Sequence, residues 1–276
     1  SEPAPVPRAT VLPLAAWCVA LHPDMQVFAS GGLETAPFTL ALTLSALVAA
    51  APVVRPELVG TLLAITSLLR PEGLLYTAAT LWYLLWRRCG MGTVKRTTSA
   101  WALLVVPLFI WRLFYYHDWL PNTFYAKSAS IAYWRQGWRY VSLYFEVYPV
   151  LLVAWIATTA VAIRRERHGE RGGLVFLCAL FSGITLLYVL HLGGDFMFAR
   201  FLLPVTPLLY VGLEEAVRHQ RRFVRLATAL AAVALTLGAR IPRDFSFPGT
   251  ALVDGIVNER ACYPDSVMRV RREQAI

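Results

Sequence analysis

The sequence predicts an all-α, polytopic membrane bundle with about eight transmembrane helices plus a partial one, an interfacial helix and a short outer C-terminal tail. The first observation behind this prediction is composition: of 276 residues, 57% are hydrophobic and only 16% are charged, with a mean hydropathy of +0.53. Soluble proteins average about 45 to 50% apolar and about 25% charged residues. A core of this size cannot hide so much apolar surface, which excludes an ordinary soluble enzyme.

The second observation is that apolar segments recur along the chain at membrane-helix length. A span needs about 17 to 25 residues. Segments of that size are 34–52, 99–116, 141–163, 173–190, 201–217 and 223–239. Segments 58–69 and 73–86 are shorter and separated only by Arg70, Pro71 and Glu72, so they are either two short spans or one broken helix. Segment 9–21 is the partial span.

The third observation is where the basic residues fall. Thirteen Lys and Arg residues lie in one alternate set of loops, around 55, 87–96, 164–171 and 218–225, whereas six lie in the other set. By the positive-inside rule the first set is cytoplasmic. This alternation requires both 58–69 and 73–86 to cross, which gives the count of about eight. The net charge of +9 is divided among separate loops, so we expect no nucleic-acid partner.

An interfacial helix is predicted over residues 124–140. Apolar and aromatic side chains lie near one helical face there: Phe124, Ile131, Trp134, Trp138 and the following Val141. We divide the chain into a transmembrane domain, 1–239, and an outward-facing C-terminal segment, 240–276. The chain starts at Ser1 on a Pro-rich stretch without a signal-peptide pattern, so we expect an N-terminally incomplete domain and a truncated tail.

Four polar clusters stand at the non-cytoplasmic ends of the predicted spans. They are SGGLET at 30–35, RPEG at 70–73, YYHDWLPNTFYAK at 115–127 and HLGGDFMFAR at 191–200. Ionisable groups at membrane depth are costly unless they pair or face water. We therefore expect one polar cavity to receive Glu34, Arg70, Glu72, Asp118, Asp195 and Arg200. For any one of them taken singly, the alternative is a solvated loop charge or a helix cap.

The carboxylates and cations of the four polar clusters are suited to the transfer of a sugar from a phosphate-linked donor. A carboxylate can deprotonate an acceptor hydroxyl, and cations can stabilise a departing phosphate. The carboxylate candidates are Asp195, Glu34 and Asp118. The substrate-binding candidates are Arg70, Glu72, Asn122, Tyr125, Lys127, His191 and Arg200.

Each of these assignments has an alternative. Arg70 can bind phosphate through its guanidinium fork, or instead form an ion pair with Glu72 or Asp195. The aromatic residues of the third cluster suit a sugar-binding lining, or instead anchor the chain at the membrane interface. No HxH, HExxH or carboxylate run marks a metal site, and the sequence marks no certain cofactor, although phosphate and acidic groups together can recruit a divalent cation.

The ordered set SGGLET, RPEG, DWLPNTFYAK and GGDFMFARFLLP, within about residues 24 to 210, resembles the integral-membrane C-type glycosyltransferases. The closest resemblance is to their terminal β-(1→2) arabinofuranosyltransferase group. It implies a polyprenyl-phosphate-linked sugar donor, a cell-envelope glycan acceptor and transfer at the outer face of the bacterial cytoplasmic membrane. The resemblance also implies a catalytic acidic pair in a first outer loop, which would lie upstream of Ser1. We therefore expect this region alone to be inactive.

Two other functions remain open from the residues. A transporter or lipid flippase would use similar intramembrane charges, although the segments show no evident inverted repeat and the charges gather at one face instead of the membrane centre. The second is a non-catalytic membrane assembly factor, since some proteins with these motifs are linked to flagellar motor control.

Overall fold

The structure, a computed structural model, describes residues 13–117, 133–170, 173–195, 197–218 and 220–239. The regular elements of these residues are helical, which confirms the predicted all-α class. The first six are α1 (Leu14–Leu21), α2 (Pro23–Ser30), α3 (Thr35–Ala50), α4 (Pro56–Leu69), α5 (Gly73–Trp86) and α6 (Met91–Tyr116). The others are α8 (Trp134–Val147), α9 (Pro149–Arg167), α10 (Leu174–Leu192), the 3-10 helix η1 (Leu203–Val205), α11 (Thr206–Val217) and α12 (Arg222–Leu237). The predicted C-terminal segment 240–276 lies outside the described residues.

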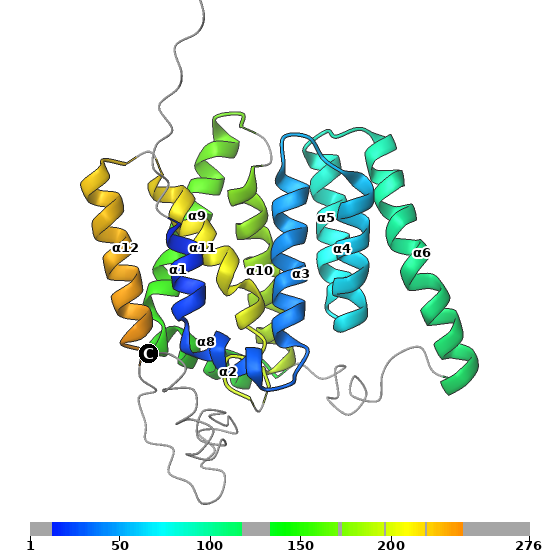
Figure 1. Cartoon of the computed structure of the whole chain (residues 1–276), viewed down its shortest axis with the longest axis horizontal. Helices are drawn as coiled ribbons and strands as arrows, with labels where there is room; N and C mark the ends of the chain where they lie inside the picture. Colours follow the sequence, from blue (N-terminus) through cyan, green and yellow to red (C-terminus); the bar gives the residue numbers. More distant parts are fainter. Residues whose placement is uncertain (1–12, 118–132, 171–172, 196, 219, 240–276) are drawn as a thin grey trace, which may run out of the picture.

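The helices stand side by side around two apolar cores (Figure 1). One core, with Phe38, Tyr76 and Phe181, lies among α3, α4, α5 and α10, and α6 packs on the outside of α4. The other core, with Tyr144 and Leu151, lies among α1, α8, α9 and α11. Helices α10 and α11 supply side chains to both cores and so join the two halves of the bundle.

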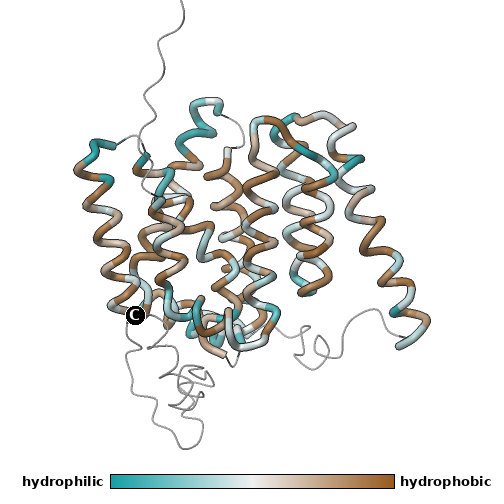
Figure 2. The backbone as a smooth tube through the Cα atoms, viewed as in Figure 1, coloured by the Kyte–Doolittle hydropathy of each residue, from teal (hydrophilic) through white to brown (hydrophobic). Residues whose placement is uncertain are grey.

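Successive connections lie at opposite ends of the bundle, as the charge pattern predicts. Figure 1 shows the turns after α3, α5, α9 and α11 at one end, and the α2–α3 and α4–α5 turns with the segment after α10 at the other. The apolar stretches run between these ends, and most of the hydrophilic backbone lies near them (Figure 2). The first end carries the larger basic set. Which side of a membrane it faces stays a prediction.

Two helices, α6 and α10, are long and apolar enough to cross a membrane. Two further pairs pass the same test together but are sharply bent: α2 with α3 by 116°, and α8 with α9 by 103°. Counting each bent pair as one span gives up to four candidates among the described residues. Helix α4 is apolar but shorter. The count of about eight spans therefore stays a prediction.

The prediction of a single span over 141–163 is wrong. Helix α8 ends at Val147, and α9 begins at Pro149 in a different direction. The proline disfavours helical geometry at the preceding residue, and Tyr148 accordingly has φ −122° and ψ 68°. The Tyr148 ring is fully buried and its hydroxyl donates a hydrogen bond to Asp24 Oδ2 at 2.6 Å, which fixes the bend.

The helix observed in this region, α8, runs past residue 140, where the predicted interfacial helix ends. Residues 124–132 lie outside the described part of the chain, and the amphipathic helix present is α8. Trp134 and Trp138 are exposed, as predicted, but Val141 is buried in the core instead of sharing their face. The buried face of α8 packs closely on α10, since a Cβ on Gly137 would meet the Leu190 backbone.

Two other boundaries differ from the predicted segments. The segment 201–217 is interrupted, because η1 precedes α11 and the residues from Phe201 to Tyr210 are buried inside the bundle. Pro204 and Pro207 lie at the starts of η1 and α11, where a missing backbone N–H costs little. Helix α6 begins at Met91 instead of at 99, because no residue between Gly90 and the apolar segment stops a helix.

Candidate functional site

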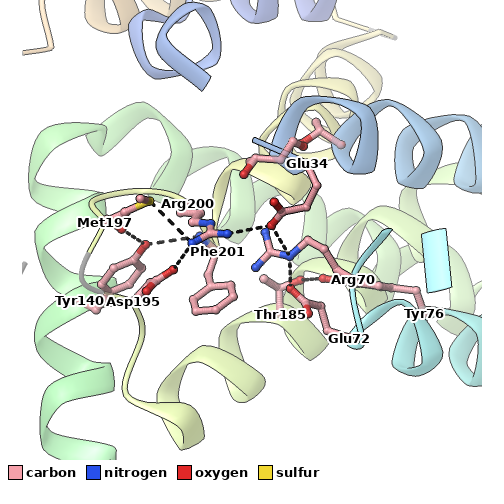
Figure 3. A network of polar contacts seen from close by, with 12 residues as sticks. Glu34, Arg70, Glu72, Tyr76, Tyr140, Thr185, Asp195, Met197, Arg200 and Phe201 are labelled. Atoms are coloured by element: carbon pink, nitrogen blue, oxygen red, sulfur yellow. Dashed lines mark hydrogen bonds and ion pairs between the residues drawn. The ribbon is translucent and has the colours of Figure 1, made fainter. Parts of the chain in front are cut away.

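Five charged side chains from three parts of the chain gather at one end of the bundle (Figure 3). They form a continuous series, in the order Glu72, Arg70, Glu34, Arg200 and Asp195. Arg70 Nε lies 2.6 Å from Glu72 Oε1 and 3.9 Å from Glu34 Oε1. Arg200 donates from Nη2 to Glu34 Oε1 at 2.8 Å and from Nη1 to Asp195 Oδ2 at 3.1 Å. We call these five residues the charged cluster.

Glu34 enters the charged cluster from the bend between α2 and α3. Gly32 has φ +71°, a conformation that glycine adopts readily, and the chain turns there before α3 begins at Thr35. Glu34 is the residue immediately before α3, and its side chain makes no capping hydrogen bond to that helix. Its carboxylate is therefore directed to the two arginines.

Arg70 and Glu72 occupy the tight connection between α4 and α5. Arg70 directly follows Leu69, the last residue of α4, and Glu72 precedes the first residue of α5, Gly73. A Cβ on Gly73 would overlap the Thr66 backbone, so only glycine permits this close approach of the two helices.

Asp195 and Arg200 belong to the segment that follows α10. Gly193 and Gly194 have φ +92° and +82°, and Gly194 lies against the Tyr140 ring, leaving no room for a side chain. The Tyr140 hydroxyl donates to Met197 O at 2.8 Å and accepts from Phe201 N–H at 3.3 Å. Tyr140 thus holds both sides of the short segment that carries the two charged residues.

The Arg70 guanidinium is enclosed by aromatic rings. Its carbon lies 5.3 Å from the centre of the Phe38 ring and 4.6 Å from that of Phe201. Rings at this distance attract a guanidinium through their quadrupoles and exclude water from it. With 4% of its surface exposed, Arg70 is a buried cation that depends on its acidic partners.

The charges of the cluster stabilise one another. Burial by itself raises the pKa of Glu34, but the hydrogen bond from Arg200 and the charges of Arg200 and Arg70 outweigh it, so that the pKa lies below its usual range. Burial likewise lowers the pKa of Arg200, but its bonds to Glu34 and Asp195 raise the net value. Both residues therefore carry their charges at neutral pH.

Two donors of the arginines remain without a partner among the described residues. Arg70 Nη1 and Arg200 Nε are buried, and neither makes a hydrogen bond. A buried donor without a partner costs about 1 to 3 kcal/mol. Each guanidinium group therefore has one donor that its present carboxylate partners do not use.

The predicted convergence of Arg70, Glu72, Asp195 and Arg200 is observed, and Glu34 joins them. Arg70 forms an ion pair with Glu72, which the sequence analysis gave as an alternative to phosphate binding. His191 is exposed at the end of α10 and contacts the edge of Trp134. Asp118, Asn122, Tyr125 and Lys127 lie outside the described residues, so their roles stay predictions.

Sequence reasoning missed the three aromatic residues that shape the cluster. Phe38 lies four positions after Glu34, and Phe201 directly follows Arg200. Their closeness in sequence to a charged residue of the cluster is a signal that could have identified both. Tyr140 gave no such signal, because it lay within the predicted interfacial segment. Within the described ranges, no group of three or more His, Cys, Asp or Glu side chains is arranged to hold a metal ion.

Comparison with known proteins gives one partial similarity. The chain is 36% identical over 110 residues to the terminal beta-(1->2)-arabinofuranosyltransferase of Corynebacterium glutamicum, a match that covers 34% of this chain and 16% of the relative. No family model and no solved structure matches the chain. Part of the chain is thus related to a glycosyltransferase, which confirms the resemblance at that level. The chain spans well under two thirds of the relative's length.

Proposed function

We propose that this chain is part of a membrane glycosyltransferase that takes a sugar, arabinofuranose or a related one, from a polyprenyl-phosphate donor. The acceptor is a glycan of the cell envelope. Transfer takes place at the outer face of the bacterial cytoplasmic membrane, where the charged cluster lies at the ends of about eight spans. The observation that carries the proposal is the convergence of the buried Arg70, the half-buried Arg200 and three carboxylates at the end of the bundle with the smaller basic set.

The chemistry of the cluster suits a lipid-borne phosphate donor. Such a donor needs cations at headgroup depth and a carboxylate able to bind sugar hydroxyls, in a site reached from the bilayer. Arg70 and Arg200 supply the cations, each with one buried donor to spare. Asp195, whose side chain is 1% exposed and paired with Arg200, supplies a fixed carboxylate beside them.

The proposed reaction is an inverting transfer. A carboxylate accepts the proton of the acceptor hydroxyl, whose oxygen then bonds to the anomeric carbon. The bond from that carbon to the phosphate oxygen breaks, and the lipid phosphate leaves with the electron pair. Arg70 and Arg200 stabilise the charge on the leaving phosphate. Asp195 orients the sugar, and Asp118 is a candidate for the base.

A sugar-transfer assay tests this proposal, using membranes that hold the complete protein. Combining Arg70→Ala with Asp195→Asn should abolish transfer, because the phosphate loses a cation and the sugar loses its carboxylate. The level of the variant in the membrane controls for folding. Full activity of the double variant would remove both residues from the mechanism and favour a transporter or an assembly factor.

A further inference from the structure

The charged cluster already holds a net negative charge before any substrate arrives. Its three carboxylates exceed its two guanidinium groups by one. A polyprenyl-phosphate sugar adds at least one more negative charge at the same place. Like charges in a poorly solvated site repel strongly. Binding of a phosphate between Arg70 and Arg200 therefore requires one carboxylate to leave its present position.

Glu34 is the carboxylate best placed to leave. Its side chain is 32% exposed, compared with 8% for Glu72 and 1% for Asp195. Glu72 is fixed in the short connection between two helices, and Asp195 lies in the segment that Tyr140 holds. Glu34 lies outside the helices, in the turn that also contains the exposed Gly32. A rotation of its side chain toward solvent needs no change in the helices.

The Glu34 carboxylate also occupies the position that an incoming phosphate needs in order to contact both Arg70 and Arg200. A single oxygen, Oε1, lies between the two guanidinium groups, at 2.8 Å from Arg200 Nη2 and 3.9 Å from Arg70 Nε (Figure 3). Arg200 Nε and Arg70 Nη1 are buried donors with no partner in the described structure. A phosphate has three or four oxygens, so it can occupy the place of Oε1 and also reach donors that a carboxylate leaves unused.

We propose that Glu34 is an internal substitute for the substrate phosphate, which binds Arg70 and Arg200 by displacing it. This inference rests on the proposed function, because it assumes a phosphate ligand at the cluster. Glu34 keeps Arg70 and Arg200 paired while the site is empty, and it lowers the affinity for weak anions that cannot replace its hydrogen bonds. The ligand it admits is a phosphate ester able to bridge both guanidinium groups.

Binding of farnesyl phosphate to the purified complete protein tests the inference, with calorimetry as the measurement. Glu34→Gln keeps the size of the side chain and removes the competing charge, so the dissociation constant should fall about tenfold, the change expected for losing one charge-assisted hydrogen bond of a competitor. Glu34→Asp keeps the charge on a shorter side chain and should give an intermediate value. Thermal unfolding of each variant shows that it is folded.

The matched control is Glu57→Gln. Glu57 pairs with Arg96 at 2.6 Å, as Glu34 pairs with Arg200, but both partners are exposed and belong to α4 and α6. This variant should leave the dissociation constant unchanged. Inorganic phosphate serves as the second probe: weaker binding than farnesyl phosphate assigns the site to a lipid-borne ester, whereas equal binding assigns it to free phosphate and overturns the lipid donor.

The outcomes separate this inference from the proposed function. If farnesyl phosphate binds the wild type and Arg70→Ala loses it, but Glu34→Gln binds no tighter, the phosphate site stands and displacement of Glu34 is wrong. Weaker binding to Glu34→Gln would likewise contradict displacement. If neither wild type nor Glu34→Gln binds farnesyl phosphate, both proposals fail.

Discussion

Arg200 and Glu34 are 166 positions apart in the sequence, and their side chains form a hydrogen bond of 2.8 Å. This bond joins the segment after α10 to the bend before α3. Through Arg70 it continues to the α4–α5 connection. The charged cluster therefore links parts of the chain that contribute to both apolar cores, and changes within it should affect both activity and stability.

Changing Arg70 to Lys should impair transfer while leaving the fold intact. Lysine keeps the positive charge but lacks the planar fork that binds phosphate through two donors. We expect sugar transfer to fall about tenfold or more, as for loss of one charge-assisted hydrogen bond in the transition state. The assay uses membranes with the complete protein. Arg96→Lys, at an exposed ion pair, is the control and should keep full activity.

Changing Gly194 to Ala should destabilise the protein. The residue has φ +82°, and a Cβ would lie 2.5 Å from the Tyr140 ring, so the substitution adds backbone strain and a clash. We expect a loss of about 2 to 4 kcal/mol in unfolding free energy. The measurement is thermal unfolding in detergent.

Gly183, inside α10, provides a contrast within the same part of the chain. A Cβ there would meet nothing within 4 Å. Gly183→Ala should therefore raise stability by about 0.5 to 1 kcal/mol, as for alanine in any open helical position. Equal effects of the two substitutions would show that the contact between Gly194 and Tyr140 is unimportant.

Glu34 should make stability depend on acidic pH. Its folded-state pKa is lowered, because the interactions with Arg200 and Arg70 outweigh the opposing effect of burial. The stabilisation is therefore complete above the unfolded pKa of about 4.3 and is lost as the pH falls through the lower folded value. The Glu34→Gln variant retains Glu72 and Asp195, so it differs from the wild type only at Glu34. The melting temperatures of the two proteins should differ at pH 7 and converge in acid. A constant difference would contradict this assignment.

The two ends of the bundle should lie on opposite sides of the membrane. In a protein whose native cysteines are replaced, Ser30→Cys, an exposed position at the end of α2 and four residues before Glu34, should react with a membrane-impermeant thiol reagent in intact cells. His168→Cys, at the basic end after α9, should react only after the membrane is opened. The reverse pattern would place the cluster in the cytoplasm and overturn the outer-face proposal.

The sequence by itself determined the all-α class and the alternation of connections between two ends. Both depend on local patterns, namely apolar length and the sign of nearby charges, which survive without knowledge of packing. The sequence also marked Glu34, Arg70, Asp195 and Arg200, because charge beside an apolar segment is costly unless it has a partner. The sequence shows that each of these charges needs a partner, but it does not show which residue that partner is.

Only the tertiary structure decided how the charges pair and where the helices bend. Arg70 selects Glu72 and Glu34 because the α4–α5 turn and the α2–α3 bend meet there, and Phe38 and Phe201 enclose it. The break at Tyr148 follows from Pro149 together with a buried bond to Asp24, 124 positions away. Contacts over such distances depend on the packing of whole helices, and no window of the sequence contains them.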